Sequence, residues 1–275
     1  MNRRTMLTAA IAATMMAAGT TAHAQDSTMQ QVRDSGVLRV GVTQAPPWYS
    51  KDIISGEWTG GLGISMGKAM AEDLGVTFEP VEVTWGTAVA ALQADRIDLM
   101  YVLDATDARK AAVNFPETPL LYYSLAVLAR DDLNITDWAD LNSPDISVSV
   151  PQATSMDAFL TENVPNADIQ RFPGNAEAIA AFQAGRVDAV TLFHPPLIAA
   201  RQKLGAGQIV VPKPVESRPS SVAVRQETDT AFVDWVNEQI GGYYTSGQTQ
   251  LWYEEFLTEF GLDPAAVPAI MRERL

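Results

Sequence analysis

Residues 98–115, DLMYVLDATDARKAAVNF, are the segment around which the rest of the chain is organised. Its apolar run at 99–103 predicts a buried strand, and the polar turn that follows leads into a helix carrying Arg109. A strand that ends where a helix begins places polar groups and a cation at the carboxyl edge of a sheet, where α/β proteins bind small ligands. We therefore predict that Arg109 binds the carboxylate of a ligand.

Strands and helices alternate in the residues before this stretch. Residues 37–42 predict a short buried strand, and the apolar spacing over 64–74 predicts an amphipathic helix that ends at Gly75. A second strand is predicted at 76–83 and a second helix at 86–94. The order β-α-β-α-β implies a parallel sheet.

The sequence also contains an internal similarity. Residues 89–100, VAALQADRIDLM, are similar to residues 179–190, IAAFQAGRVDAV, and residues 40–45, VGVTQA, are similar to residues 148–153, VSVPQA. The first pair predicts a helix, a turn and a strand, and the second pair predicts a strand followed by a loop. Two similarities of this kind predict two lobes of the same βα design, although chance similarity between alanine-rich helices is the alternative.

These features predict an α/β fold with two Rossmann-like lobes, a two-strand hinge and a ligand cleft between the lobes. We expect lobe 1 to comprise residues 38–121 and 220–275, and lobe 2 to comprise residues 126–215. The β-rich runs near 122–130 and 220–225 would form the hinge. The helical C-terminal part would belong to lobe 1, because the chain has already crossed back.

The N-terminal residues have the composition of an export signal. Arg3 and Arg4 precede an apolar stretch that ends in Ala22-His23-Ala24, so residues 1–24 are predicted to be a signal peptide. The paired arginines also fit a twin-arginine signal, which leaves both the Sec and the twin-arginine routes open. An N-terminal membrane anchor is the alternative. Export predicts a periplasmic location.

The composition excludes several classes of function. The 251 residues after this leader hold 17 basic and 33 acidic residues, and their net charge of −16 disfavours nucleic acid as a partner. The absence of cysteine excludes thiolate metal sites and cysteine nucleophiles. His194 is the one histidine left, and Pro195 and Pro196 behind it favour a loop. We expect no metal site and no cofactor.

The order of several motifs resembles one protein family. LRVGV begins at Leu38, GGLGISMGKAMAEDLG begins at Gly60, Trp85 precedes ALQADRIDLM, and TDARKAAVNF follows. This order resembles the extracytoplasmic (periplasmic) solute-binding proteins of polar-amino-acid ABC importers, which have the type II periplasmic-binding-protein fold. The resemblance implies two lobes that close over a small-molecule ligand without performing chemistry, and an ABC transporter permease as partner. We expect a monomer.

The resemblance also implies the ligand contacts. In this family the arginine at the position of Arg109 forms a bidentate pair with the ligand α-carboxylate, a geometry that a planar guanidinium favours. Gln152, Thr154 and Ser155 would lie on the other side of the same carboxylate, at a helix N-terminus that favours anions. An ordinary helix cap is the alternative for Thr154 and Ser155. The family usually has glycine where this chain has Ala153.

Asp104 is the clearest departure from the family. A small hydroxyl residue is usual five positions before the arginine, and the family's ammonium-binding carboxylate near Phe193 has no counterpart here. Asp104 could bind a ligand ammonium, or it could partly neutralise Arg109 and weaken carboxylate binding. Standard amino-acid specificity is therefore not implied by the resemblance.

Aromatic residues at strand ends and in loops complete the predicted site. Trp48, Tyr101 and Phe193 are expected to face the cleft, where aromatic rings can pack on a side chain or attract a cation. Trp85 is expected to be a core residue.

The sequence thus predicts a periplasmic protein that captures a small carboxylate-bearing solute, such as an amino acid, a derivative or an amine, and delivers it to an ABC importer. One alternative is a periplasmic lyase of the cyclohexadienyl dehydratase type, in which Asp104 would protonate a leaving hydroxyl. Another is an accessory or sensor module that docks a periplasmic partner.

Overall fold

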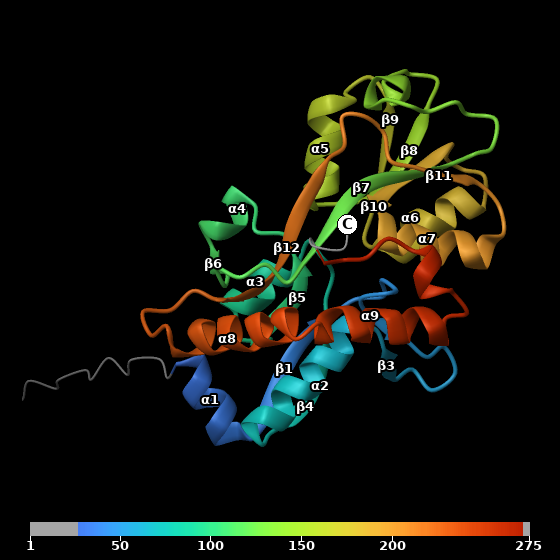
Figure 1. Ribbon diagram of the computed structural model, residues 1–275. Helices are drawn as coiled ribbons and strands as arrows, with labels where there is room; N and C mark the ends of the chain where they lie inside the picture. The colour runs from blue at the N-terminus through green and yellow to red at the C-terminus, as the bar shows by residue number, and fades with distance from the viewer. Residues whose placement is uncertain (1–26, 272–275) are drawn as a thin grey trace, which may run out of the picture.

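Two α/β lobes joined by two long strands form the fold (Figure 1). The computed structural model describes residues 27–271, so the signal peptide predicted at 1–24 lies outside the described residues. None of the helices between residues 27 and 271 combines the length and the apolar character that crossing a membrane requires. The fold class predicted from the sequence is confirmed.

The first lobe contains the N-terminal elements and the C-terminal helices. These are α1 (Thr28–Ser35), β1 (Val37–Val42), β2 (Ser50–Lys51), β3 (Trp58–Gly60), α2 (Leu62–Leu74), β4 (Thr77–Glu82), α3 (Ala88–Gln93), β5 (Leu99–Leu103), α4 (Asp107–Lys110), β6 (Val113–Asn114), α8 (Ala231–Thr245), α9 (Gln248–Glu259) and the 3-10 helix η2 (Pro264–Ala266). As predicted, α2 ends at Gly75, whose left-handed backbone (φ 70°) suits glycine. The C-terminal helices pack on the N-terminal ones, α8 on α1 and α9 on α2.

The second lobe is a continuous part of the chain. Its elements are the 3-10 helix η1 (Trp138–Leu141), β8 (Ser147–Pro151), α5 (Ser155–Asn163), β9 (Asp168–Phe172), α6 (Asn175–Gln183), β10 (Ala189–Phe193), α7 (His194–Leu204) and β11 (Gln208–Val210). The strands β7 (Leu121–Ala129) and β12 (Ser217–Arg225) connect the two lobes.

The two lobes share one topology. In the first lobe β1 pairs in parallel with β4 and β5, and in the second lobe β8 pairs in parallel with β9 and β10. The similar sequence segments also adopt the same local structure. The carboxylate of Asp98 accepts from the Arg39 N–H at 2.7 Å, and that of Asp188 accepts from the Ser147 N–H at 2.8 Å. The two-lobe interpretation of the internal similarity is therefore confirmed, and chance similarity is not needed to explain it.

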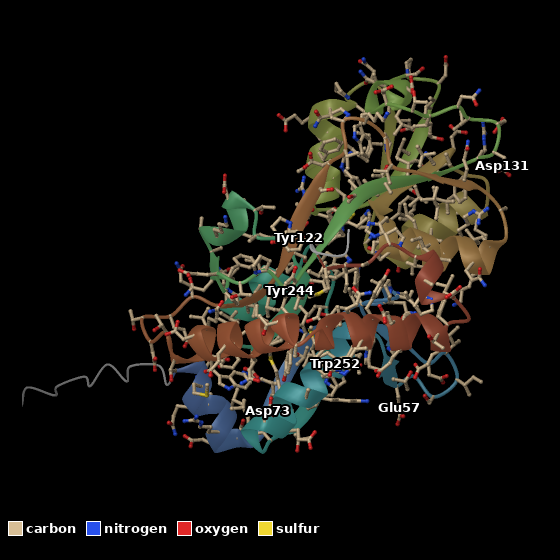
Figure 2. The ribbon with its side chains drawn as sticks, in the orientation of Figure 1. Glu57, Asp73, Tyr122, Asp131, Tyr244 and Trp252 are labelled. Atoms are coloured by element: carbon tan, nitrogen blue, oxygen red, sulfur yellow. The ribbon has the colours of Figure 1, made fainter. Side chains whose placement is uncertain are left out.

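Each connecting strand belongs to both the hinge and a lobe. The first part of β12 pairs with the first part of β7, while residues 221–224 of β12 pair with β5. The second part of β7 pairs with β10 in the other lobe. Figure 2 shows Tyr122 of β7 beside Tyr244 of α8, whose rings meet edge to face with centroids 6.4 Å apart. The hinge strands thus join the strands of both lobes into one ten-stranded sheet.

The prediction of a loop at His194 is wrong. His194 begins α7, and Pro195 and Pro196 occupy the first turn, where proline is well tolerated because no intrahelical N–H is needed there. Its side chain is buried, and Nδ1 accepts a 3.2 Å hydrogen bond from the N–H of Ser124 in β7. This hydrogen bond therefore connects the start of α7 to hinge strand β7.

Candidate ligand-binding site

A small cavity lies where the carboxyl ends of strands from both lobes meet. Its volume is about 30 Å³, room for about one water molecule. Six of the residues predicted to bind ligand line it, and these are Trp48, Asp104, Arg109, Thr154, Ser155 and Phe193. We call it the central cavity. Its position follows from the topology, because parallel strands in each lobe end at the edge that faces the other lobe.

Asp104 lies at the centre of the polar contacts in this cavity. It follows β5 directly and is buried, and its two carboxylate oxygens accept hydrogen bonds from the hydroxyls of Tyr123 and Ser155. Burial and the negative charge of Asp104 raise the pKa of Tyr123 well above its usual value, so the phenol remains a donor. Since Ser155 belongs to the second lobe, the Asp104 carboxylate links the two lobes.

Arg109 is held beside Asp104 without a direct ion pair. Its Nη1 donates to the backbone oxygen of Asp104 at 3.1 Å and its Nη2 donates to the backbone oxygen of Ala153 at 3.2 Å. Within residues 27–271, no carboxylate oxygen lies within 4 Å of its guanidinium nitrogens. Burial lowers the pKa of Arg109, and the charge of Asp104 opposes this shift. A half-buried cation without a paired anion is suited to bind a carboxylate.

Thr154 and Ser155, in the second lobe, direct their hydroxyl groups to different partners. Thr154 caps α5, since its hydroxyl accepts from the Asp157 N–H at 3.1 Å and donates to the Pro151 oxygen at 2.7 Å. Ser155, the first residue of α5, instead directs its hydroxyl at Asp104. Gln152 is exposed and does not line the central cavity. The geometry therefore favours Ser155 over Thr154 and Gln152 as a polar contact of the site.

The aromatic residues divide between the cavity and the core. Trp48 lines the cavity and packs on Tyr253, with ring centroids 6.1 Å apart. Phe193 lines it as well and packs edge-on against Tyr123. The prediction that Tyr101 faces the cleft is wrong, because its fully buried side chain points to α2, where the hydroxyl contacts the sulfur of Met70 at 3.0 Å.

Seven lining residues were not among the predicted ligand contacts, and three of them carry polar side-chain groups: Tyr123, Trp85 and Asn175. The indole Nε1 of Trp85 donates a buried 3.0 Å hydrogen bond to Oδ1 of Asn175. Trp85 precedes α3 and Asn175 begins α6, the two helices that the internal similarity pairs. That pairing was the sequence signal that could have identified them. The bond is a further polar link between the lobes, beside those from Asp104 to Ser155 and from Arg109 to the Ala153 oxygen.

Two residues at the site have a strained backbone. Val102 has φ 60° at the point where the pairing of β12 with β5 shifts register, which marks a bulge, and it lines the cavity. Ala153 has φ 57°, a conformation that glycine adopts without cost. Positive φ in non-glycine residues is concentrated at functional sites, where the surrounding structure imposes it. The backbone oxygen of Ala153 accepts a hydrogen bond from Arg109, and Val102 lies two residues before Asp104.

Metal binding has no support in this part of the chain. Across residues 27–271, no group of three or more histidine, aspartate or glutamate side chains is arranged to hold a metal ion. The charged groups that line the cavity are the guanidinium of Arg109 and the carboxylate of Asp104.

Comparison with known proteins identifies the family. The sequence model of the bacterial extracellular solute-binding proteins, family 3, matches residues 38–259. The general L-amino acid-binding periplasmic protein AapJ of Rhizobium johnstonii is 29% identical over 244 residues, which are 84% of this chain and 70% of that protein. The resemblance deduced from the order of motifs is confirmed.

Two further relatives connect binding proteins with an enzyme. One is the ancestral amino acid-binding protein AncCDT-1, a precursor of cyclohexadienyl dehydratase, whose crystal structure matches this one with a TM-score of 0.74. The two sequences are 30% identical, and the match covers 85% of this chain and 99% of AncCDT-1. Cyclohexadienyl dehydratase of Pseudomonas aeruginosa is 23% identical over 190 residues, 66% of this chain and 68% of the enzyme.

Proposed function

The chain belongs to family 3 of the bacterial extracellular solute-binding proteins, and we propose that its solute is an amino acid or a close derivative, which it delivers to an ABC importer. One observation carries the proposal: the guanidinium of Arg109 and the carboxylate of Asp104 line the same cavity between the lobes without forming an ion pair with each other. A zwitterion presents the two complementary charges.

Arg109 would bind the ligand carboxylate and Asp104 the ligand ammonium. Each charge-assisted hydrogen bond contributes roughly 1.5–3 kcal/mol when one partner is ionised. The hydroxyl of Tyr123, on hinge strand β7, already holds the Asp104 carboxylate in place. A carboxylate fixed before the ligand arrives loses little conformational entropy on binding, and this favours affinity.

Ligand entry requires movement of the lobes. The central cavity of about 30 Å³ is too small for an amino acid, and contacts from Asp104 to Ser155 and from Arg109 to the Ala153 oxygen close it. We place the movement at the hinge near residues 122–130 and 220–225, between lobe 1 (38–121 and 220–275) and lobe 2 (126–215). Opening would break these few contacts and leave the strand pairing within each lobe intact.

The cellular setting follows from the same proposal. Residues 1–24 would act as a signal peptide that directs the chain to the periplasm, where it would work as a monomer. Its partners would be the small-molecule ligand and the permease of an ABC transporter.

A ligand screen tests the proposal. The protein is unfolded in denaturant, refolded to remove any co-purified ligand, and heated with L-amino acids, amines or organic acids. A ligand that binds only the folded state at 100 times its Kd adds about 2.7 kcal/mol of stability. For a chain of this size this corresponds to a rise in Tm of roughly 5–10 °C. Failure of every zwitterion to raise the Tm would refute the proposal.

A dehydratase is the second candidate, and the buried acid Asp104 in the cavity is the observation that favours it. Both of its oxygens, however, accept hydrogen bonds from Tyr123 and Ser155, so neither is directed as a proton donor at a leaving group. We therefore expect no turnover of prephenate or arogenate. Turnover that is lost on Asp104→Asn would replace the binding role with an enzymatic one.

A further inference from the structure

A second, larger cavity adjoins the central one. It has a volume of about 430 Å³ and shares the lining residues Asn175 and Pro196 with the central cavity. Its walls come from both lobes, with Pro46 and Phe260 on one side and helices α6 and α7 on the other. We call it the side chamber. Its volume lies in the range of about 300–1,000 Å³ that small-molecule sites occupy.

We infer that the side chamber holds the side chain of the ligand, and that this side chain is long, mainly aliphatic and terminated by a carboxylate. The inference rests on the proposed function, because Arg109 and Asp104 would hold the α-carboxylate and the ammonium in the central cavity. The side chain would pass into the chamber at Asn175 and Pro196, the two residues that line both cavities. The central cavity fixes the common part of an amino acid, and the chamber selects among side chains.

The walls of the chamber are apolar along most of its length. They include Ala45, Ile179, Ala199, Ala200 and Leu204. Each methylene that a ligand buries against such a wall contributes about 0.8 kcal/mol, which corresponds to roughly fourfold in affinity. Short or strongly polar side chains gain nothing from these walls, so the lining favours an extended aliphatic chain.

Lys203, an exposed residue of α7, adds a cation to the lining of the chamber. The Nζ of Lys203, on α7, lies 5.1 Å from the centroid of the Phe260 ring, on the opposite lobe. Among residues 27–271, no carboxylate lies within 4 Å of this ammonium. The amide of Gln183 on α6 also lines the chamber. In a chain of net charge −14, an unpaired lysine in an interlobe cavity favours a ligand that ends in an anion.

Calorimetry with a matched series of L-amino acids tests this inference. The series comprises 2-aminobutyrate, 2-aminoheptanoate, 2-aminopimelate and lysine, which differ in length and in terminal charge. We expect 2-aminopimelate to bind at least tenfold more tightly than 2-aminobutyrate, and more tightly than 2-aminoheptanoate or lysine. In Lys203→Met the ratio of affinities for 2-aminopimelate and 2-aminobutyrate should fall roughly threefold to tenfold, since a partly exposed charge pair is modest in strength.

Two further variants separate the possible outcomes. Ala176→Trp, at an exposed position of the lining, should fill the chamber and remove binding of the two long ligands while 2-aminobutyrate still binds. Lys68→Met, at an exposed site on α2 outside the chamber, serves as the control for loss of a positive charge. Equal affinity for the short and long ligands, or an unchanged ratio in Lys203→Met, overturns the inference but leaves the proposed function standing. Failure of the whole series also overturns the inference, and the broad ligand screen then decides separately on the proposed function.

Discussion

Trp85 and Asn175 join the two lobes through one buried hydrogen bond, 3.0 Å from the indole Nε1 to Oδ1. The bond lies in the wall of the central cavity, and Asn175 also lines the side chamber. It forms between the starts of two equivalent helices, α3 and α6. Closure of the lobes therefore satisfies a polar pair that an open form would expose to water.

Trp85→Phe tests whether this bond stabilises the closed form. The variant leaves Oδ1 of Asn175 buried without its donor, which costs about 1–3 kcal/mol in the closed state. We expect the Kd of a bound amino acid to rise about tenfold. Trp235→Phe, at a half-buried position on α8, is the control. Equal Kd values in calorimetry for both variants and the wild type would show that the bond does not contribute to closure.

Asp104→Asn distinguishes the two roles considered for this residue. If Asp104 binds the ammonium, affinity for an amino acid should fall by about tenfold or more, because a charge-assisted bond is lost. Affinity for the desamino carboxylate with the same side chain should stay constant or rise. The test compares both ligands by calorimetry. Tighter binding of the amino acid itself would instead indicate that Asp104 weakens Arg109.

His194→Asn tests the pH dependence of stability. Burial lowers the pKa of His194 from 6.5 to about 4, and the N–H of Ser124 donates to its Nδ1, which requires the neutral ring. Between these values the unfolded chain binds a proton that the folded chain does not, so the free energy of unfolding decreases as pH falls through this window. We expect a loss of about 1 kcal/mol between pH 7.5 and 5.5 in urea unfolding.

The asparagine variant should lack this loss. Its Oδ1 can still accept from the Ser124 N–H but has no proton equilibrium in this range. The comparison is made above pH 5.5, where ordinary carboxylates are largely ionised in both states. The same pH dependence in the variant and the wild type would exclude His194 as its cause.

Ala153→Gly should stabilise the protein. Ala153 has φ 57°, which costs a residue with a Cβ roughly 1–2 kcal/mol relative to its preferred conformations. Part of this gain is offset because glycine is more flexible in the unfolded chain, so the net gain should be about 1 kcal/mol or less, or roughly 2–4 °C in Tm. The same substitution at the exposed helical residue Ala180 should destabilise. A fall in Tm on Ala153→Gly would contradict the strain argument.

The strand that carries the site, β5, could be predicted from the sequence alone. The bounds of β5 and β1 match the predicted runs, because apolar segments flanked by polar turns leave little choice of end point. The meeting of Asp104, Arg109 and Ser155 could also be predicted, since the ends of parallel strands in two similar lobes face one cleft.

The direction of individual side chains could not be predicted in the same way. All residues of β5 are buried, so alternation of polar and apolar residues gives no sign of which face Tyr101 occupies, and the bulge at Val102 changes the register. Tyr123 lies in an almost wholly apolar hinge strand that offers no polar pattern to mark a site. The role of His194 was missed for a different reason, because paired prolines fit a helix start as well as a loop.

The role of Arg109 is tested by the Kd of Arg109→Met for an amino acid that the wild type binds. Two charge-assisted hydrogen bonds to the carboxylate are lost, so we expect affinity to fall by at least about 100-fold in calorimetry. Arg186→Met, at an exposed position of the turn before β10 in lobe 2, should bind like the wild type. Wild-type affinity in a folded Arg109→Met protein would show that Arg109 does not bind the ligand carboxylate.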